Sequence, residues 1–91
     1  MVLKSITYSE HAIQQMFKRN ISVLIVEETI LTGKVIKEYP NDKPYPSILI
    51  LHFINNRPIH VVLAINNESG IVVTAYEPDP IIWENGFETK K

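Results

Sequence analysis

Two apolar segments separated by a short polar turn constrain the fold of this chain more than any other feature. Residues Ser47–Ile54 and Pro58–Ile65 are rich in β-branched side chains, and Asn55-Asn56-Arg57 lies between them. Asparagine tolerates the positive φ that tight hairpin turns require, so the pattern predicts an antiparallel β-hairpin. Both segments are far shorter than the roughly 18 apolar residues that a membrane-spanning helix needs.

The register of this hairpin decides which side chains face the core. We expect the bulkier apolar set on each strand to face inward, because side chains alternate across a strand. These sets are Leu49, Leu51 and Phe53 on the first strand, and Ile59, Val61, Leu63 and Ile65 on the second. A three-residue turn pairs residue 54 with residue 58 and places His52 opposite His60. A two-residue turn shifts the register by one residue and separates the two histidines.

The opposite face of the predicted sheet is also partly apolar, since it carries Ile48, Ile50, Val62 and Ala64. Thr74 and Tyr76 of the last strand are expected on this same histidine-bearing face. An exposed apolar face usually meets a second surface. We expect its cover to be a partner, a second copy, or the chain's own C-terminal residues Ile81, Ile82 and Trp83.

Two helices are predicted before the hairpin. Ser9 and Ser22 suit helix N-caps, because their hydroxyls can accept unpaired backbone N–H groups. Asn20 and Gly33 suit the ends of the two helices. The sequence therefore predicts an αα-hairpin over the first third of the chain.

The remaining elements are strands and a short helix. Three prolines within Tyr39–Pro46 exclude both a helix and a central strand there. Residues 34–39 and 71–76 read as strands, and Asp79 as the cap of a short helix that Gly86 ends. We predict an α+β domain, with the N-terminal αα-hairpin packed on a four-stranded, mostly antiparallel sheet and a short C-terminal helix.

Composition excludes several classes of site. The chain has 91 residues, no cysteine, and a formal net charge of -1 from 9 basic and 10 acidic residues. Without cysteine there is no disulfide, thiolate zinc site or cysteine nucleophile. The balance of charge provides no global field for RNA or DNA, so nucleic-acid binding needs a local patch. With no signal-peptide pattern evident, we expect one domain over residues 1–91, in the cytoplasm and not on a membrane.

Three histidines are the candidates for acid–base chemistry, because histidine titrates near neutral pH. Their spacing matches no zinc motif, so we expect neither a metal site nor a cofactor. His11 lies opposite the apolar stripe of the first helix, as a surface histidine or an acid–base group. His60 lies in mid-strand, where it is either a structural histidine bonded to the hydroxyl of Thr74 or Tyr76, or a general acid or base.

Basic side chains form no run, yet several could line an RNA-contacting surface together with tyrosine rings. Arg19 lies at the border of the apolar stripe, where it either covers the edge of the core or binds a phosphate. The other candidates for RNA contact are Lys18, Lys37, Tyr39 and Arg57. An ordinary solvated surface explains the same spacing.

An ordered set of short motifs extends over nearly the whole chain. They are Tyr8-Ser9-Glu10-His11-Ala12, Arg19 before Ile21-Ser22, Gly33-Lys34-Val35-Ile36, Glu38-Tyr39-Pro40, Pro44-Tyr45-Pro46, Arg57-Pro58-Ile59-His60-Val61-Val62, and Thr74-Ala75-Tyr76-Glu77-Pro78-Asp79 with Trp83 and Phe87. From Tyr8 to Phe87 the chain resembles a family of small bacterial and archaeal proteins, domain of unknown function four-two-five-eight.

The resemblance implies a relation to the RelE/ParE-like and MqsR-like toxins, which are frequently encoded beside a small zinc-finger antitoxin. It implies the toxin of a type II toxin–antitoxin pair, cutting mRNA without a metal. The polar positions carried over are His11, Arg19, Tyr39, His60 and Tyr76. We predict that His60 and His11 transfer protons, that Arg19 binds the phosphate, and that Tyr39 or Tyr76 stacks on a base.

Against this implication, the chain has a pI near 6.3, whereas RNA-cutting toxins are usually strongly basic. The alternative is a non-catalytic interaction module. It would form a homodimer or bind a partner protein through the second face of the sheet.

Overall fold

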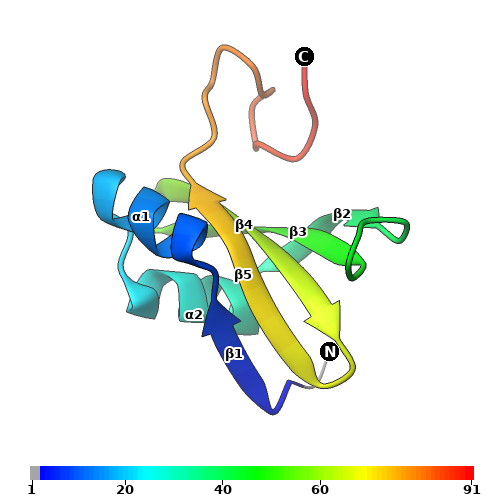
Figure 1. The fold of residues 1–91 in the computed structure, drawn as a ribbon. Coiled ribbons are helices and arrows are strands. Elements are labelled where there is room, and N and C mark those ends of the chain that lie inside the picture. The colour runs from blue at the N-terminus through cyan, green and yellow to red at the C-terminus, as the bar shows by residue number, and fades with distance from the viewer. Residues whose placement is uncertain (1–2) are drawn as a thin grey trace.

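A computed structural model describes residues 3–91 as a five-stranded sheet with two helices on one face (Figure 1). The elements are β1 (Ser5–Tyr8), α1 (Glu10–Lys18), α2 (Val23–Thr32), β2 (Lys34–Tyr39), β3 (Ser47–Ile54), β4 (Arg57–Asn66) and β5 (Ser69–Tyr76). The strand order is β1-β5-β4-β3-β2, with β1 parallel to β5 and the other pairs antiparallel. Among residues 3–91, no helix has the length and apolar character needed to span a membrane.

The prediction of a four-stranded sheet is wrong, because the chain begins with an additional strand. β1 pairs Ser5 with Ser69 and Tyr8 with Val72, in parallel with β5 at the edge of the sheet. In Figure 1 this first strand lies directly beside β5. Four residues are too few to show a clear alternating pattern, and the pairing partner lies 64 positions away along the chain. The mixed sheet therefore depends on a contact that local sequence does not reveal.

The predicted C-terminal helix is also wrong. The Asp79 carboxylate accepts from the Ile81 N–H at 2.8 Å, which is a local turn that competes with a helix. The Asp79 carbonyl accepts from the N–H groups of Ile82 and Trp83, and the chain then turns back through Gly86 and Phe87, at φ 88° and 60°. We call residues 78–91 the C-terminal segment. It forms turns that fold back toward the sheet.

Both helices begin where the capping serines predict. The Ser9 hydroxyl accepts from the Ala12 N–H at 3.0 Å, and the Ser22 hydroxyl accepts from the Ile25 N–H at 3.2 Å. Asn20 adopts a left-handed φ of 55° between the helices. The core packs one side of both helices on the sheet, and its buried members are Ala12, Met16, Ile21, Val26, Ile30, Ile50, Ile59, Val61, Leu63, Val72 and Ala75.

The hairpin takes the two-residue turn rather than the three-residue one. Ile54 pairs with Arg57, and the turn residues Asn55 and Asn56 have φ values of 51° and 68°. His52 therefore lies opposite Ile59, and the two histidines occupy opposite faces of the sheet. The alternative in which they face each other is wrong.

This register corrects the expected core face of β3. Ile50 pairs with Val61 and lies in the core, whereas Leu49, Leu51 and Phe53 lie on the second face. The core assignment of Ile59, Val61 and Leu63 on β4 is confirmed. Thr74 and Tyr76 pair with Val62 and His60, which confirms their place on the histidine-bearing face.

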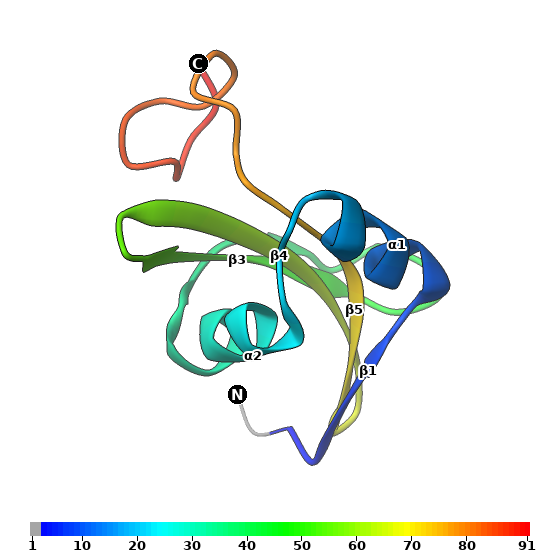
Figure 2. The same ribbon diagram turned by 90° about the vertical axis from the view of Figure 1, so that its left-hand side faces the viewer.

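The second face of the sheet is partly covered by the chain itself. Figure 2 shows α2 and the C-terminal segment on opposite sides of β3 and β4. Trp83, only 7% exposed, is the anchor of this segment, whereas Ile81 and Ile82 remain 80% and 50% exposed. Of the three covers that the sequence left open, the chain's own C-terminal residues supply one. Trp83 provides the buried contact, and the residues around it form turns rather than a helix.

Candidate functional site

Two adjoining hollows lie beside Trp83 on the second face of the sheet. The arginine hollow has a volume of 450 Å³ and is lined by Arg19, Tyr76, Glu77, Asp79, Ile82 and Trp83. The lysine hollow has a volume of 330 Å³ and is lined by Ile36, Lys37, Tyr39, Trp83, Glu88, Thr89 and Lys90. Four of the side chains singled out by sequence, Arg19, Tyr76, Lys37 and Tyr39, therefore meet around one tryptophan.

Arg19 reaches the arginine hollow because α1 ends beside β5. It is the C-terminal cap of α1, and its backbone N–H bonds to the Gln15 carbonyl. Its Nη1 donates to the Ala75 carbonyl at 2.9 Å, and the Thr74 hydroxyl lies 3.5 Å away. Within residues 3–91 Arg19 forms no salt bridge to a carboxylate. The guanidinium is thus held at the hollow by neutral oxygens, and neither Glu77 nor Asp79, which line the same hollow, is paired with it.

His60 lies beneath the arginine hollow and is completely buried. Its Nε2 lies 2.8 Å from the Phe87 carbonyl oxygen, and its Nδ1 lies 3.2 Å from the Tyr76 hydroxyl. The Trp83 ring meets the His60 ring edge-on, with centroids 4.5 Å apart. A carbonyl can only accept, so Nε2 carries the proton and Nδ1 accepts from the Tyr76 hydroxyl.

Burial changes the acid–base behaviour of this pair. Removal from water lowers the pKa of His60, against a smaller raising effect of the hydrogen bond to the Phe87 carbonyl. Burial also raises the pKa of Tyr76, with nearby Tyr39 adding to the effect and Arg19 opposing it. At neutral pH both groups are therefore uncharged, and one hydrogen bond joins them.

The lowered pKa of His60 predicts a loss of stability in weak acid. The unfolded chain takes up a proton on His60 as the pH falls through about 6.5, whereas the folded protein does not until its lower pKa is reached. Stability from this group is complete above about pH 6.5 and decreases as the pH falls from there to the folded pKa. Urea unfolding between about pH 7.5 and about pH 5.5 measures it.

A His60→Asn variant is the control for this pH dependence. Its unfolding free energy should fall less than that of the native protein over the same interval, because the variant lacks the buried imidazole and keeps every other side chain. Equal decreases in the two proteins would contradict the prediction.

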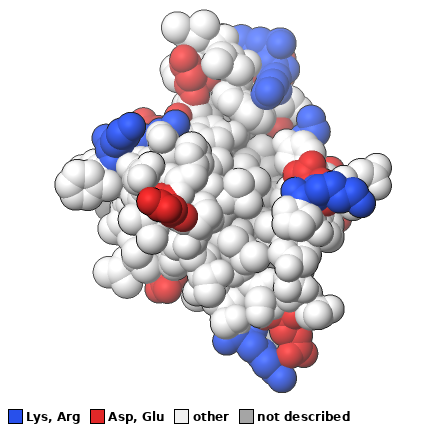
Figure 3. All heavy atoms as spheres, viewed as in Figure 1, with Lys and Arg blue, Asp and Glu red and all other residues white. Residues whose placement is uncertain are grey.

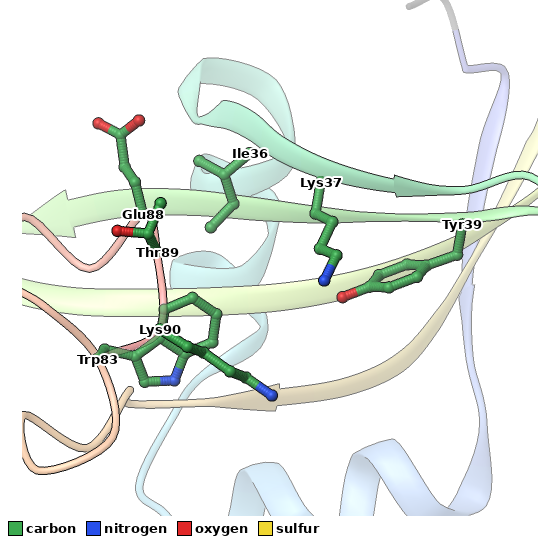
Figure 4. Close-up of a pocket in the computed structure, with 7 residues that line it drawn as sticks. All are labelled: Ile36, Lys37, Tyr39, Trp83, Glu88, Thr89 and Lys90. Carbon is green, nitrogen blue, oxygen red and sulfur yellow. The ribbon is translucent and has the colours of Figure 1, made fainter.

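The lysine hollow presents two cations held against aromatic rings. The Lys37 ammonium lies 5.6 Å from the centroid of the Tyr39 ring, and the Lys90 ammonium lies 5.7 Å from that of Trp83 (Figure 4). Such cation–π contacts orient an ammonium group without neutralising it. Glu88 lines the same hollow, but Lys34 pairs with it at 2.8 Å.

The Arg57 side chain, predicted to contact RNA, forms hydrogen bonds to other groups of the protein instead. Its Nε donates to the Glu77 carboxylate at 2.6 Å, and its Nη1 and Nη2 donate to the carbonyls of Asn20 and Arg19. It thereby ties the turn between the helices to the ends of β4 and β5. This places the Arg19 backbone near the arginine hollow, so the contacts of Arg57 position the site.

Three other candidates lie away from both hollows. His11 and Lys18 are exposed on α1 and line neither hollow. His52 lies on the helix-bearing face, where its Nε2 is 2.8 Å from the Glu28 carboxylate and 3.3 Å from the Thr32 hydroxyl. The structure thus brings together Arg19, Tyr76, His60, Tyr39 and Lys37, and leaves His11, Lys18 and His52 apart.

Sequence reasoning missed Lys90 and Thr89, because residues 88–91 are all polar and show no pattern that predicts a contact with the sheet. In the structure, Trp83 and Lys90 form a β-bridge, and the Lys91 N–H bonds to the Ile82 carbonyl at 2.9 Å. The only available signal was Trp83 itself, since a lone tryptophan near a terminus needs a surface to pack on.

On the face of the molecule in Figure 3, most charged side chains form small clusters in which Lys or Arg lies beside Asp or Glu, and a broad uncharged stretch lies between these clusters. Within residues 3–91, no three His, Asp or Glu side chains gather closely enough to hold a metal ion.

Comparison with known proteins gives one match. A family model described as a domain of unknown function, DUF4258, matches residues 8–77, as the sequence motifs indicate. No curated protein and no solved structure matches the chain. The matched range includes Arg19, Tyr39, His60 and Tyr76, whereas Trp83 and Lys90 lie beyond it.

Proposed function

This chain belongs to the DUF4258 family, a domain of unknown function, and we propose from its geometry that it is a metal-independent endoribonuclease. Its substrate is mRNA, and its cellular role is that of the toxin in a type II toxin–antitoxin pair, acting in the cytoplasm. The observation that carries the proposal is one arrangement in the arginine hollow. Tyr76, whose hydroxyl is bonded to His60 Nδ1, and Arg19 line the same open space.

The proposed reaction is attack by the ribose 2′-oxygen on the adjacent phosphorus. The 2′-hydroxyl gives its proton to the Tyr76 oxygen while Tyr76 gives its own to His60 Nδ1, so that buried His60 acts as base through Tyr76. The bond from phosphorus to the 5′-oxygen breaks, and that oxygen takes a proton from water. The products carry a 2′,3′-cyclic phosphate and a 5′-hydroxyl.

Arg19 has an electrostatic role in this reaction. Charge develops on the non-bridging oxygens as the 2′-oxygen adds to phosphorus, and a fixed guanidinium stabilises that charge. Arg19 is already oriented by the Ala75 carbonyl, so little of its freedom remains to be lost on binding. Tyr39, on the far side of Trp83, offers a ring for stacking a neighbouring base.

Two substitutions in the arginine hollow test this function. We expect Tyr76→Phe and Arg19→Gln each to lower the rate of RNA cleavage about 100-fold, since one removes the proton acceptor and the other the phosphate cation. The assay uses mixed-sequence RNA with chelator present and identifies the ends of the products. Circular dichroism shows whether each variant is folded.

Matched controls lie close by in the chain. Lys18→Gln removes one positive charge next to Arg19, and Tyr45→Phe removes a hydroxyl from a tyrosine that lines neither hollow. Both should keep near-native cleavage. RNA left intact by the native protein at high concentration would contradict the proposed function.

A second candidate function is protein binding, and exposed apolar side chains on the helices favour it. Phe17 is 88% exposed on α1, and Leu24 and Leu31 are each 78% exposed on α2. Leu24 and Leu31 are seven residues apart in one helix and so share a face. An antitoxin or a second copy of the chain would dock here, rather than on the second sheet face. Analytical ultracentrifugation of the native protein and of Leu24→Glu tests the homodimer directly.

A further inference from the structure

We infer that the lysine hollow is a phosphate-binding subsite for the nucleotide next to the one cleaved. The ligand class is single-stranded RNA with at least two backbone phosphates, one at Arg19 and one between Lys37 and Lys90. This inference rests on the proposed function for the identity of the ligand. The positions of Lys37 and Lys90 in the hollow do not depend on whether the protein cleaves RNA.

The charges around the lysine hollow favour an anion. Lys37 and Lys90 have no carboxylate partner within residues 3–91, whereas Glu88 is paired with Lys34 and the Glu84 carboxylate accepts from the Thr89 hydroxyl at 2.9 Å. Glu88, the carboxylate that lines the hollow, is thus paired with Lys34, and neither ammonium group is neutralised by a carboxylate. A phosphate is the common biological anion that accepts from two such donors at once.

The aromatic rings fix where these cations are presented. Figure 4 shows Lys37 reaching along Tyr39 and Lys90 lying across Trp83, on the two sides of the hollow. Tyr39 is only half-buried, so its ring is open to a base while its neighbour Lys37 meets the phosphate. Cations interleaved with an accessible ring are the usual surface for single-stranded RNA.

The wall shared by the two hollows indicates the path that a single RNA strand would take across the surface. Trp83 is a wall of both hollows, so a strand leaving Arg19 and Tyr76 passes over the Trp83 edge before it meets Lys37 and Lys90. Lys90 and Trp83 lie outside the matched range 8–77, whereas Lys37 lies inside it. The C-terminal segment therefore completes a subsite that the family-matched part of the chain provides only in part.

The test is binding of a fluorescent five-nucleotide RNA whose riboses are 2′-O-methylated and which therefore cannot be cleaved. We expect the double variant Lys37→Gln/Lys90→Gln to bind about 10-fold more weakly than the native protein at low salt. The slope of log affinity against log salt should fall by about 1.4, because each contact to single-stranded RNA contributes about 0.7. The control Lys43→Gln/Lys91→Gln removes the same charge from residues that do not line the hollow.

The outcomes separate this inference from the proposed function. Equal affinity and salt slope in the two double variants, or no binding by the native protein, would overturn the subsite even if the protein cleaves RNA. Lysine-dependent binding by a protein that leaves RNA intact would establish the subsite and reject the ribonuclease. Quenching of Trp83, the only tryptophan in the chain, by the unlabelled oligonucleotide gives a second readout at the hollow itself.

Discussion

Replacing Trp83 with alanine is expected to lower the free energy of unfolding by about 4 kcal/mol. The side chain is only 7% exposed, and it covers the ring of completely buried His60. Its loss leaves a cavity over the sheet and admits water to His60, where water competes for the hydrogen bonds of the imidazole. Urea unfolding followed by circular dichroism measures the change, because the variant has no tryptophan fluorescence.

A neighbouring substitution serves as the control for Trp83. Ile81 belongs to the same segment but is 80% exposed, so Ile81→Ala should change stability by less than about 0.5 kcal/mol. The pKa of His60, followed by NMR, should also move up toward its ordinary value in Trp83→Ala. A loss below about 1 kcal/mol for Trp83→Ala would mean that the C-terminal segment does not cover the sheet in solution.

Replacing Gly33 with alanine is expected to cost about 3 kcal/mol. A Cβ at this position would lie 2.8 Å from the Leu51 carbonyl oxygen and 2.7 Å from the Ile50 Cγ2, and closer still to the Thr29 carbonyl oxygen. Two of these three atoms belong to the backbone of α2 and β3 and cannot move independently. Since φ at Gly33 is -76°, an ordinary value, the requirement is for space and not for conformational freedom.

Gly86 provides the matched comparison, because a Cβ there has space but the backbone is left-handed. Nothing lies within 4 Å of a Cβ there, but φ is +88°. Gly86→Ala should therefore cost only the strain of the left-handed backbone, about 1 kcal/mol. Urea unfolding of both variants measures the difference, and equal losses would refute the steric explanation for Gly33.

Local elements of this fold could be predicted because their causes are local. Ser9 and Ser22 cap their own helices, and their hydroxyls bond to N–H groups three residues away. The prolines of Tyr39–Pro46 remove backbone donors wherever they stand, so that segment is a connection in any fold. None of these features needs the rest of the chain.

The hairpin register could not be predicted, because both faces of β3 and β4 are apolar. Ile48 and Ile50 compete with Leu49 and Leu51 for the core, and hydrophobicity alone does not separate them. The helices bury the set that contains Ile50, while the C-terminal segment lies over the other face, where Leu51 is 4% exposed. One residue of turn length between β3 and β4 therefore decides that His52 lies opposite Ile59, on the face where it meets Glu28, and not opposite His60.

By itself, the sequence determined two capped helices, an Asn-Asn hairpin, a proline-rich connection and the residue types available for chemistry. Short-range sterics and hydrogen bonds are sufficient for each of these. Only the tertiary structure decided the parallel β1–β5 pair, the fold-back of the C-terminal segment, and the meeting of Arg19, Tyr76 and Lys90 around Trp83. These contacts join residues far apart in the chain, and their free energy depends on packing surfaces that exist only once the sheet has formed.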